Sequence, residues 1–212
     1  MKELQILSEK LASRLSKPLP GLEAQLIMAT KKRLSLPFRN SPTSSAKPSA
    51  VLILLYPCKQ DIYFVLMRRP DYTGVHSGQI SLPGGKYEKT DRDLVETAVR
   101  EAHEEVGIEP SAVHITGTLS PLYIPPSNYV VTPVVSWAEQ RPEFKGDPRE
   151  VDEIIEVKLS DFMDDKHVQT KRIKLFMGIS ANFPCFYIDA NIIWGATAMM
   201  LSEFRVILKE IL

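Results

Sequence analysis

The sequence predicts an α/β fold in which a mixed sheet lies between layers of helix, with a helical extension at the N-terminus. Strand-like apolar runs flank a charged helical segment in the middle of the chain, and a second long helical segment closes it. Strands that surround a central helix and precede a closing helix are typical of an α/β/α sandwich. The 212 residues are enough for one domain with a sizeable core.

The N-terminal part, residues 1–48, is expected to form a helix and a connecting arm, and residues 49–212 the main domain. Apolar residues recur at helical spacing over 2–16, and a second short helix is expected over 22–32. Prolines and serines over 35–50 indicate the arm. This N-terminal part shows no recognisable chemistry. It is expected to pack on the core or on a second subunit, which leaves a homodimer open.

The main domain is expected to alternate between strands and a few helices. Alternating or continuous apolar runs predict strands over 51–56, 62–68, 78–83, 112–120, 129–138, 152–158, 171–177 and 183–188. The first two are expected to pair across a turn that contains Pro57, and the third to lead into a Gly-Gly turn. Helical patterns cover about 92–106, 159–164 and 194–211. Gly107 is a suitable C-terminal cap for the first of these helices.

The composition argues against several classes of partner. Lys and Arg together number 26, as do Asp and Glu, so no global positive charge recruits nucleic acid or an anionic membrane. No apolar run reaches membrane-spanning length, and the N-terminus has no signal-type apolar core. The expected location is therefore cytoplasmic. Cys58 and Cys185 lie far apart without metal-type spacing, so each is expected to be a small buried residue.

A cluster of acidic residues follows the Gly-Gly pair at 84–85. Glu101, Glu104 and Glu105 lie three and four residues apart and therefore on one face of the helix. Carboxylates crowded in this way repel one another, and a hard cation such as Mg²⁺ or Mn²⁺ would relieve the repulsion. The alternative is an ordinary solvated acidic face.

Residues 84–108 resemble the Nudix box, the signature of hydrolases that cleave nucleoside diphosphates linked to another group. Asp91 stands where the pattern has Glu, and eight residues rather than seven separate it from the Arg-Glu pair. The coenzyme A pyrophosphatase branch of the family is similar on both counts. The positions that match the pattern are Gly85, Arg100, Glu101, Glu104, Glu105, Gly107 and Ile108.

The resemblance implies roles for these residues. Glu101 and Glu105 would bind Mg²⁺ or Mn²⁺, and Glu104 would share a second ion. The Gly85 carbonyl would add an oxygen ligand, since glycine lets the backbone come close to a metal. Arg100 belongs to the catalytic set as an orienting residue, paired with an acidic neighbour so that the carboxylates keep their positions.

The general base is left between two places. Some members of the family use a glutamate of the box helix, for which Glu104 is the candidate. Others use one on a distant loop, for which Glu150 and Glu153 are candidates. The alternative interpretation of that second stretch is a solvated acidic loop.

The stretch before the box resembles an additional motif of the coenzyme A branch, with Gly78 and the Pro-Gly-Gly of 83–85 in place. The arginine that this motif carries four residues before Gly78 is Gly74 here. Arg68 or Arg69 would then supply the positive charge beside Gly84, unless both form an exposed strand end. His76 is expected to be a hydrogen-bonded structural residue.

Two further stretches extend the resemblance over roughly 50–212. Ser127, Asn128 and Tyr129 would line a pocket, although the preceding Pro-Pro equally suits a rigid turn. Trp194 is expected in the core first and near a ligand second. Gly195 and Ala196 would let the last helix pack closely.

The implied activity is divalent-metal-dependent hydrolysis of a small nucleotide substrate. Coenzyme A or acyl-coenzyme A would give phosphopantetheine and adenosine 3′,5′-bisphosphate. The Gly at position 74 keeps ADP-ribose or another nucleoside diphosphate derivative as an alternative substrate. A non-catalytic nucleotide-binding Nudix domain is the alternative from another class, but such domains usually lose the box carboxylates, which are all present here.

Overall fold

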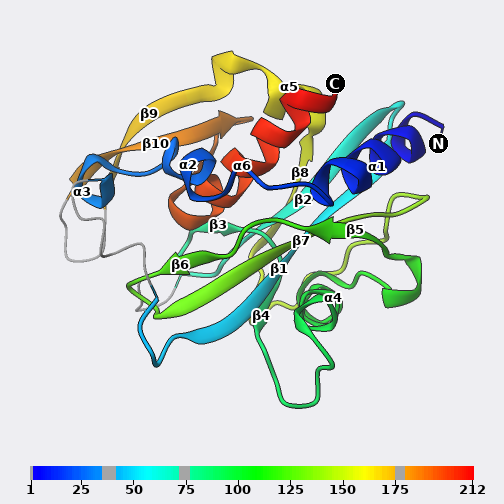
Figure 1. The fold of residues 1–212 in the computed structure, drawn as a ribbon, viewed down its shortest axis with the longest axis horizontal. Helices are drawn as coiled ribbons and strands as arrows, with labels where there is room; N and C mark the ends of the chain where they lie inside the picture. The colour runs from blue at the N-terminus through cyan, green and yellow to red at the C-terminus, as the bar shows by residue number, and fades with distance from the viewer. Residues whose placement is uncertain (1, 35–41, 72–76, 175–179) are drawn as a thin grey trace.

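The structure, a computed structural model, describes residues 2–34, 42–71, 77–174 and 180–212 (Figure 1). The helices are α1 (Lys2–Leu15), α2 (Gly21–Leu26), α3 (Lys31–Leu34), α4 (Leu94–Val106), α5 (Leu159–Met163) and α6 (Gly195–Ile211). The strands are β1 (Lys47–Cys58), β2 (Asp61–Arg68), β3 (Ile80–Ser81), β4 (Gly84–Lys86), β5 (His114–Thr118), β6 (Leu122–Ile124), β7 (Tyr129–Trp137), β8 (Glu153–Lys158), β9 (Val168–Lys174), β10 (Ser180–Ile188) and β11 (Asn191–Trp194).

The main sheet is mixed, as predicted. Its strands follow the order β3-β2-β1-β7-β5, while β4 pairs with β1, β6 with β7 and β8 with β2. The central pair, β1 and β7, is parallel, and the other pairs are antiparallel. A second small sheet has the order β11-β10-β9.

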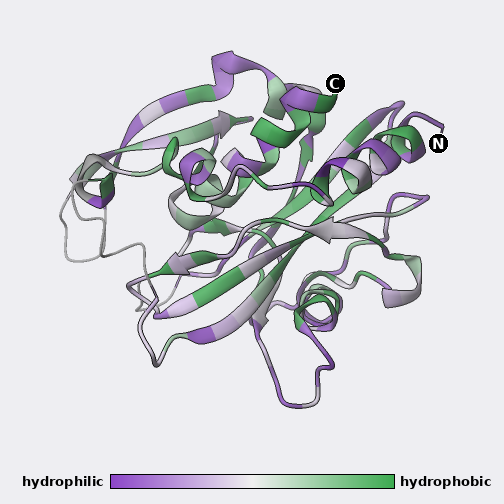
Figure 2. Ribbon diagram, in the orientation of Figure 1, coloured by the Kyte–Doolittle hydropathy of each residue, from purple (hydrophilic) through white to green (hydrophobic). Residues whose placement is uncertain are grey.

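Helices cover both faces of the main sheet, so the predicted α/β/α sandwich is confirmed (Figure 1). On one face, Ala98, Ala102 and Val106 of α4 pack against buried residues of β1 such as Leu52 and Leu54. On the other face, α1, α2 and α6 bury a larger apolar cluster. Figure 2 shows apolar residues along β1, β2 and β7 and a mixture of apolar and polar residues on α4. Of the acidic residues of α4, Glu104 is exposed and Glu101 half-buried, whereas Glu105 lies on the buried face with Ala98 and Ala102.

The first two predicted strands form a hairpin, but its turn differs from the prediction. Lys59 and Gln60, rather than Pro57, form the connection, with φ of 49° and 70°. Two successive residues at positive φ are the geometry that a tight two-residue hairpin requires. Pro57 lies within β1, opposite Ile62 of β2.

Other elements also differ from the prediction. Gly84 and Gly85 belong to β4, which pairs with β1, rather than to a turn. The helix expected over 22–32 is divided into α2 and α3, since the N–H groups of Met28 and Ala29 bond to carbonyls only three residues earlier. The short strands β6 and β11 were not predicted, and the last helix begins at Gly195. Residues 175–177 of an expected strand lie outside the described residues.

The N-terminal segment packs on the core. Leu4, Leu7 and Leu11 of α1 belong to the larger apolar cluster. Gln25 of α2 donates a buried hydrogen bond of 2.9 Å to Glu203 of α6. In the part of the chain that the structure describes, no helix is long and apolar enough to cross a membrane.

The two cysteines have different surroundings. Both are free thiols. Cys185 is buried, as predicted, whereas Cys58 is only half-buried at the end of β1. Burial raises the pKa of the Cys185 thiol.

Candidate active site

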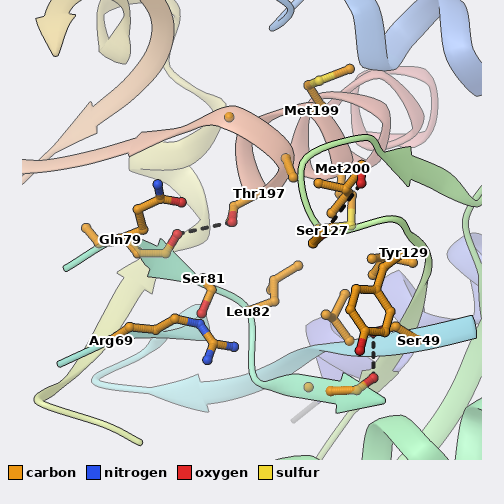
Figure 3. Close-up of a pocket in the computed structure, with 18 of the residues that line it drawn as sticks. Ser49, Arg69, Gln79, Ser81, Leu82, Ser127, Tyr129, Thr197, Met199 and Met200 are labelled. Carbon is orange, nitrogen blue, oxygen red and sulfur yellow. Dashed lines mark hydrogen bonds between the residues drawn. The ribbon is translucent and has the colours of Figure 1, made fainter. Parts of the chain in front are cut away.

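A cavity of about 1290 Å³ opens between α4, the ends of the central strands, the α2–α3 segment and the start of α6. Figure 3 shows its middle, with Arg69, Ser81 and Leu82 on one side and Ser127, Tyr129 and Met200 on another. The four box residues Arg100, Glu101, Glu104 and Glu105 line one end of it.

Local sequence fixes both ends of α4. The Asp93 side chain accepts a hydrogen bond of 2.9 Å from the N–H of Glu96, which caps the first turn. Gly107 adopts the left-handed conformation, with φ of 75°, and its N–H bonds to the carbonyl of His103. This confirms the predicted cap and sets where the acidic residues stand relative to the sheet.

Gly85 and Glu101 are packed directly against each other. A Cβ atom added to Gly85 would lie 2.4 Å from the carboxyl carbon of Glu101. The Gly85 carbonyl, which the sequence suggested as a metal ligand, accepts a hydrogen bond from the Ser49 hydroxyl (2.5 Å). Glycine is therefore required here because a carboxylate occupies the place of a side chain.

Glu105 is buried and bonded to the neighbouring glycine. The N–H of Gly84 donates to Glu105 Oε2 at 2.7 Å, and Arg69 Nη2 lies 3.7 Å from Glu105 Oε1. Burial raises the pKa of Glu105 to about 8, while the Gly84 N–H and the Arg69 cation act in the opposite direction. A cation at this carboxylate would displace the proton.

Arg100 fastens the acidic helix to the preceding loop. Its Nε and Nη2 donate to the two oxygens of Asp91 at 2.9 and 3.0 Å, and Nη2 also bonds to the Lys86 carbonyl. Its Nη1 reaches Glu101 at 3.1 Å and Glu104 at 3.4 Å. The Arg100 side chain, with help from an N–H of the loop and from Thr97, holds the pKa of the Asp91 carboxyl well below its usual range. This geometry supports a positioning role for Arg100.

The two leading candidates for the base approach the cavity from different elements. Glu104 is exposed on α4 and within reach of Arg100. Glu150 lies in the loop before β8, and its charge acts on Glu101 and Glu105. The N–H of Asp147 bonds to the Glu105 carbonyl at 2.9 Å, which ties this loop to the end of α4. Glu153 pairs with Arg68 instead.

The donor set suits a hard divalent cation. Glu101, Glu104 and Glu105 offer carboxylate oxygens beside the Gly85 backbone, the oxygen-rich chemistry that Mg²⁺ and Mn²⁺ prefer. Among the described residues, no three acidic, His or Cys side chains already converge on one point. Arg100 holds Glu101 and Glu104, so these two side chains would turn toward an ion. The residues therefore fit a metal ion whose binding would reorient the Glu101 and Glu104 side chains.

The substrate-binding candidates fall into two groups. Arg69, Gly84 and Ser127 line the cavity. Arg68 is not among the described residues that line the cavity. Its guanidinium pairs instead with Glu153 at 2.8 Å and with Asn191.

Asn128 also lies outside the lining set. It has φ of 55°, and its amide bonds to Ser45 and accepts from Tyr123, which fixes the arm on β6. A structural role therefore accounts for its contacts. Gly74 and His76 lie outside the described residues.

The start of α6 differs in part from expectation. Trp194 is half-buried, stacks edge-on with Phe183 at 4.7 Å and lines the cavity. Gly195 has φ of 67°, and a Cβ there would meet nothing within 4 Å. Glycine is therefore needed for backbone conformation, not for the close packing that the sequence suggested.

Several lining residues were not identified from the sequence. Met28, Ala29, Thr30 and Arg33 bring the N-terminal segment into the cavity wall. The Ser81 hydroxyl is buried at the wall and has no hydrogen-bond partner among the described residues. No local motif marks these residues, because long-range packing brings them to the site.

Comparisons with known proteins agree with the site. The NUDIX domain family model matches residues 46–175. A protein of Yersinia enterocolitica named "Uncharacterized Nudix hydrolase NudL" is 34% identical over 169 residues, covering 80% of this chain and 85% of the relative. A Yersinia pestis protein of the same name is 34% identical over 159 residues, covering 75% and 78%. The fold and the acidic helix thus define a hydrolase of phosphoanhydride bonds, a pyrophosphatase. The chain belongs to the Nudix hydrolase family.

Solved structures show lower similarity. A Nudix hydrolase from Alicyclobacillus acidocaldarius has a TM-score of 0.47 at 15% identity, covering 58% of this chain and 83% of that chain. The Nudix domain of Shewanella oneidensis NrtR, complexed with ADP ribose, has a TM-score of 0.45 at 17% identity, covering 62% and 85%.

Proposed function

We propose that this Nudix hydrolase cleaves the diphosphate of coenzyme A or an acyl-coenzyme A, giving 4′-phosphopantetheine or its acyl derivative and adenosine 3′,5′-bisphosphate. The observation that carries the proposal is the shape of the cavity. One continuous space joins the acidic end of α4 to a long apolar wall. At about 1290 Å³ it exceeds the usual upper range of about 1000 Å³ for ligand pockets.

The apolar wall suits a substrate with a long uncharged arm. It is formed by Met28, Ile124, Trp194, Met199 and Met200, among others. Methionine side chains are flexible and polarisable, so they adapt to chains of different shape. Both the pantetheine arm and an acyl group attached to it would bury apolar surface there.

The acidic end supports the chemistry. Glu101, Glu105 and Glu104 would hold divalent ions, which neutralise charge on the diphosphate when bound. Glu150 is proposed as the base because it faces the other carboxylates from a separate loop. It takes a proton from the attacking water as one anhydride P–O bond breaks and the adenosine bisphosphate leaves.

Parallel turnover assays test the proposal. Coenzyme A, acetyl-coenzyme A, a longer acyl-coenzyme A and ADP-ribose are supplied with Mg²⁺ and then Mn²⁺, and the products are identified by mass. Preferred hydrolysis of the coenzyme A series supports the proposal. Preference for ADP-ribose would replace it with the alternative substrate class, and turnover of none with a nucleotide-binding role.

We also propose a domain division, a class of partner and a cellular location for the protein. Residues 1–48 serve as a helical extension of a Nudix domain over 49–212, since α1 and α2 pack on the core. The protein is proposed to act on a small-molecule nucleotide in the cytoplasm and not on nucleic acid, in keeping with its zero net charge.

A further inference from the structure

The segment from Met28 to Arg33 forms one wall of the cavity, away from the acidic helix. Its position is built by buried polar contacts. Glu203 of α6 accepts hydrogen bonds from Gln25 and from the N–H of Gly21, and Ser202 donates to the Ala24 carbonyl. Figure 1 shows α2 lying beside α6 and α3 following it, on the opposite side of the view from α4.

Among the residues of this segment whose side chains the structure describes, Arg33 is the cationic one that lines the cavity. The Thr30 carbonyl accepts from the Arg33 N–H at 2.9 Å, which fixes the backbone of α3. The Arg33 Nη2 donates to the Tyr123 carbonyl of β6 at 2.6 Å, which fixes the side chain. The side chain is half-buried, and burial lowers the pKa of its guanidinium. An anion is bound more strongly by such a group than by a fully hydrated one.

The other arginines of the cavity serve the acidic end. Arg69 faces Glu105, and Arg100 pairs with Asp91 and Glu101. Arg33 comes from a different element and is joined to β6, the strand that precedes Ser127 and Tyr129 in the cavity wall. Among the described lining residues, positive charge therefore lies at two places: at Arg33, and beside the acidic helix, where Lys86 joins Arg69 and Arg100. A substrate with one diphosphate alone would use only the place beside the acidic helix.

We propose that Arg33 is a specificity-determining residue that binds an anionic group of the phosphate monoester class, carried by the substrate at a distance from the diphosphate that is cleaved. A guanidinium presents N–H donors in a planar fork that matches phosphate oxygens. The inference rests on the proposed function only in taking the substrate to be a diphosphate with a second phosphate.

The test compares substrates that differ only in that second phosphate. Coenzyme A and dephospho-coenzyme A are assayed with the full-length wild type, Arg33→Gln and Arg33→Lys. Arg68→Gln is the matched control, because it makes the same chemical change outside the cavity lining. In Arg33→Gln, kcat/KM for coenzyme A should fall by about 10- to 100-fold, mainly through KM, and stay within about threefold for dephospho-coenzyme A. The kcat/KM of Arg33→Lys for coenzyme A should lie between the values of the wild type and Arg33→Gln.

Equal losses for both substrates, or no loss for either, would overturn the inference. Equal kcat/KM of the wild type for coenzyme A and dephospho-coenzyme A would also overturn the inference, but it would not contradict the proposed function. Product inhibition of the wild-type enzyme tests the same inference without any variant. Adenosine 3′,5′-bisphosphate should inhibit more strongly than adenosine 5′-monophosphate, and equal inhibition would contradict the assignment.

Failure of the proposed function looks different. The wild type would then hydrolyse ADP-ribose but neither form of coenzyme A. Inhibition of ADP-ribose hydrolysis by the two adenosine phosphates, in wild type and Arg33→Gln, would then decide the role of Arg33 by itself. A preference for the bisphosphate that disappears in Arg33→Gln supports the inference, and its persistence overturns it.

Discussion

The carboxylate of Glu101 occupies the space that a side chain on Gly85 would need. A Cβ at residue 85 would lie 2.4 Å from the carboxyl carbon and 2.4 and 2.5 Å from its two oxygens. Separations of this size are not tolerated between non-bonded atoms, so one residue must move. Strand β4 and helix α4 are thus in direct contact at Gly85 and Glu101, where the acidic residues meet the backbone of the sheet.

Gly85→Ala is therefore expected to displace Glu101 and reduce turnover by on the order of 100-fold, because catalytic geometry is sensitive to shifts of about 1 Å. The fold should persist, since the added methyl group lies at the cavity. Turnover and thermal unfolding check this together. Gly117→Ala is the control, because its Cβ would meet the Leu15 side chain at 3.0 Å, away from the cavity. Normal activity in Gly85→Ala would contradict the assignment of Glu101.

Glu105→Gln should abolish most activity while preserving the fold. The amide oxygen can still accept the hydrogen bond from Gly84, so the backbone contact survives. The negative charge for a cation is lost, and turnover should fall by several orders of magnitude. The measurement is kcat over a range of Mg²⁺ concentrations, with circular dichroism as the control. Near-normal turnover at any concentration would remove Glu105 from the metal site.

Local sequence was sufficient to predict the acidic helix. Its end at Gly107 and the shared face of its glutamates were predicted because they depend on residues within a few turns of one another, whereas the cap at Asp93 was not predicted. The pair Gly84-Gly85 shows the limit of such reasoning. The two residues were expected in a turn, yet they form a strand because β1, about 35 residues earlier, supplies the partner.

The rest of the cavity depends on contacts between distant residues. Arg33 and Tyr123 are 90 residues apart in sequence, so no local pattern predicts that the N-terminal segment reaches the site. The same holds for Arg68, whose residue type suggested substrate binding but whose partners, Glu153 and Asn191, come from β8 and β11. Charge alone predicts what a side chain can bind, whereas packing decides what it meets.

The two candidate bases should respond differently to substitution. Glu150→Gln should lower kcat by about 100-fold or more, the range of a lost general base, with little change in metal dependence. Glu104→Gln should instead raise the concentration of Mg²⁺ needed for half-maximal activity. Metal titrations of both variants at saturating substrate separate these outcomes. A mild effect of Glu150→Gln combined with a large loss of kcat in Glu104→Gln would move the base to the helix.

Asp91→Asn should destabilise the protein in a pH-dependent way. Asp91 is buried and forms a two-point ion pair with Arg100, and this contact lowers its pKa in the folded state. A lowered folded-state pKa stabilises the fold fully above the unfolded value, about 3.9, and the contribution is lost as pH falls toward the folded value. At pH 7 the variant should be less stable by about 2–4 kcal/mol, since one partner of a buried pair loses its charge.

Below about pH 3.9 the difference in the free energy of unfolding between wild type and Asp91→Asn should shrink, because the stabilisation by the ionised Asp91 declines there. Urea unfolding at pH 7, 5 and 3 measures it. Asp61→Asn is a suitable control, since Asp61 also forms an ion pair, with Lys158, but the side chains of both partners are substantially exposed. Its effect should be small at each pH, as for other exposed ion pairs. A difference for Asp91→Asn that is the same at pH 7 and pH 3 would show that shape and not charge accounts for the role of this residue.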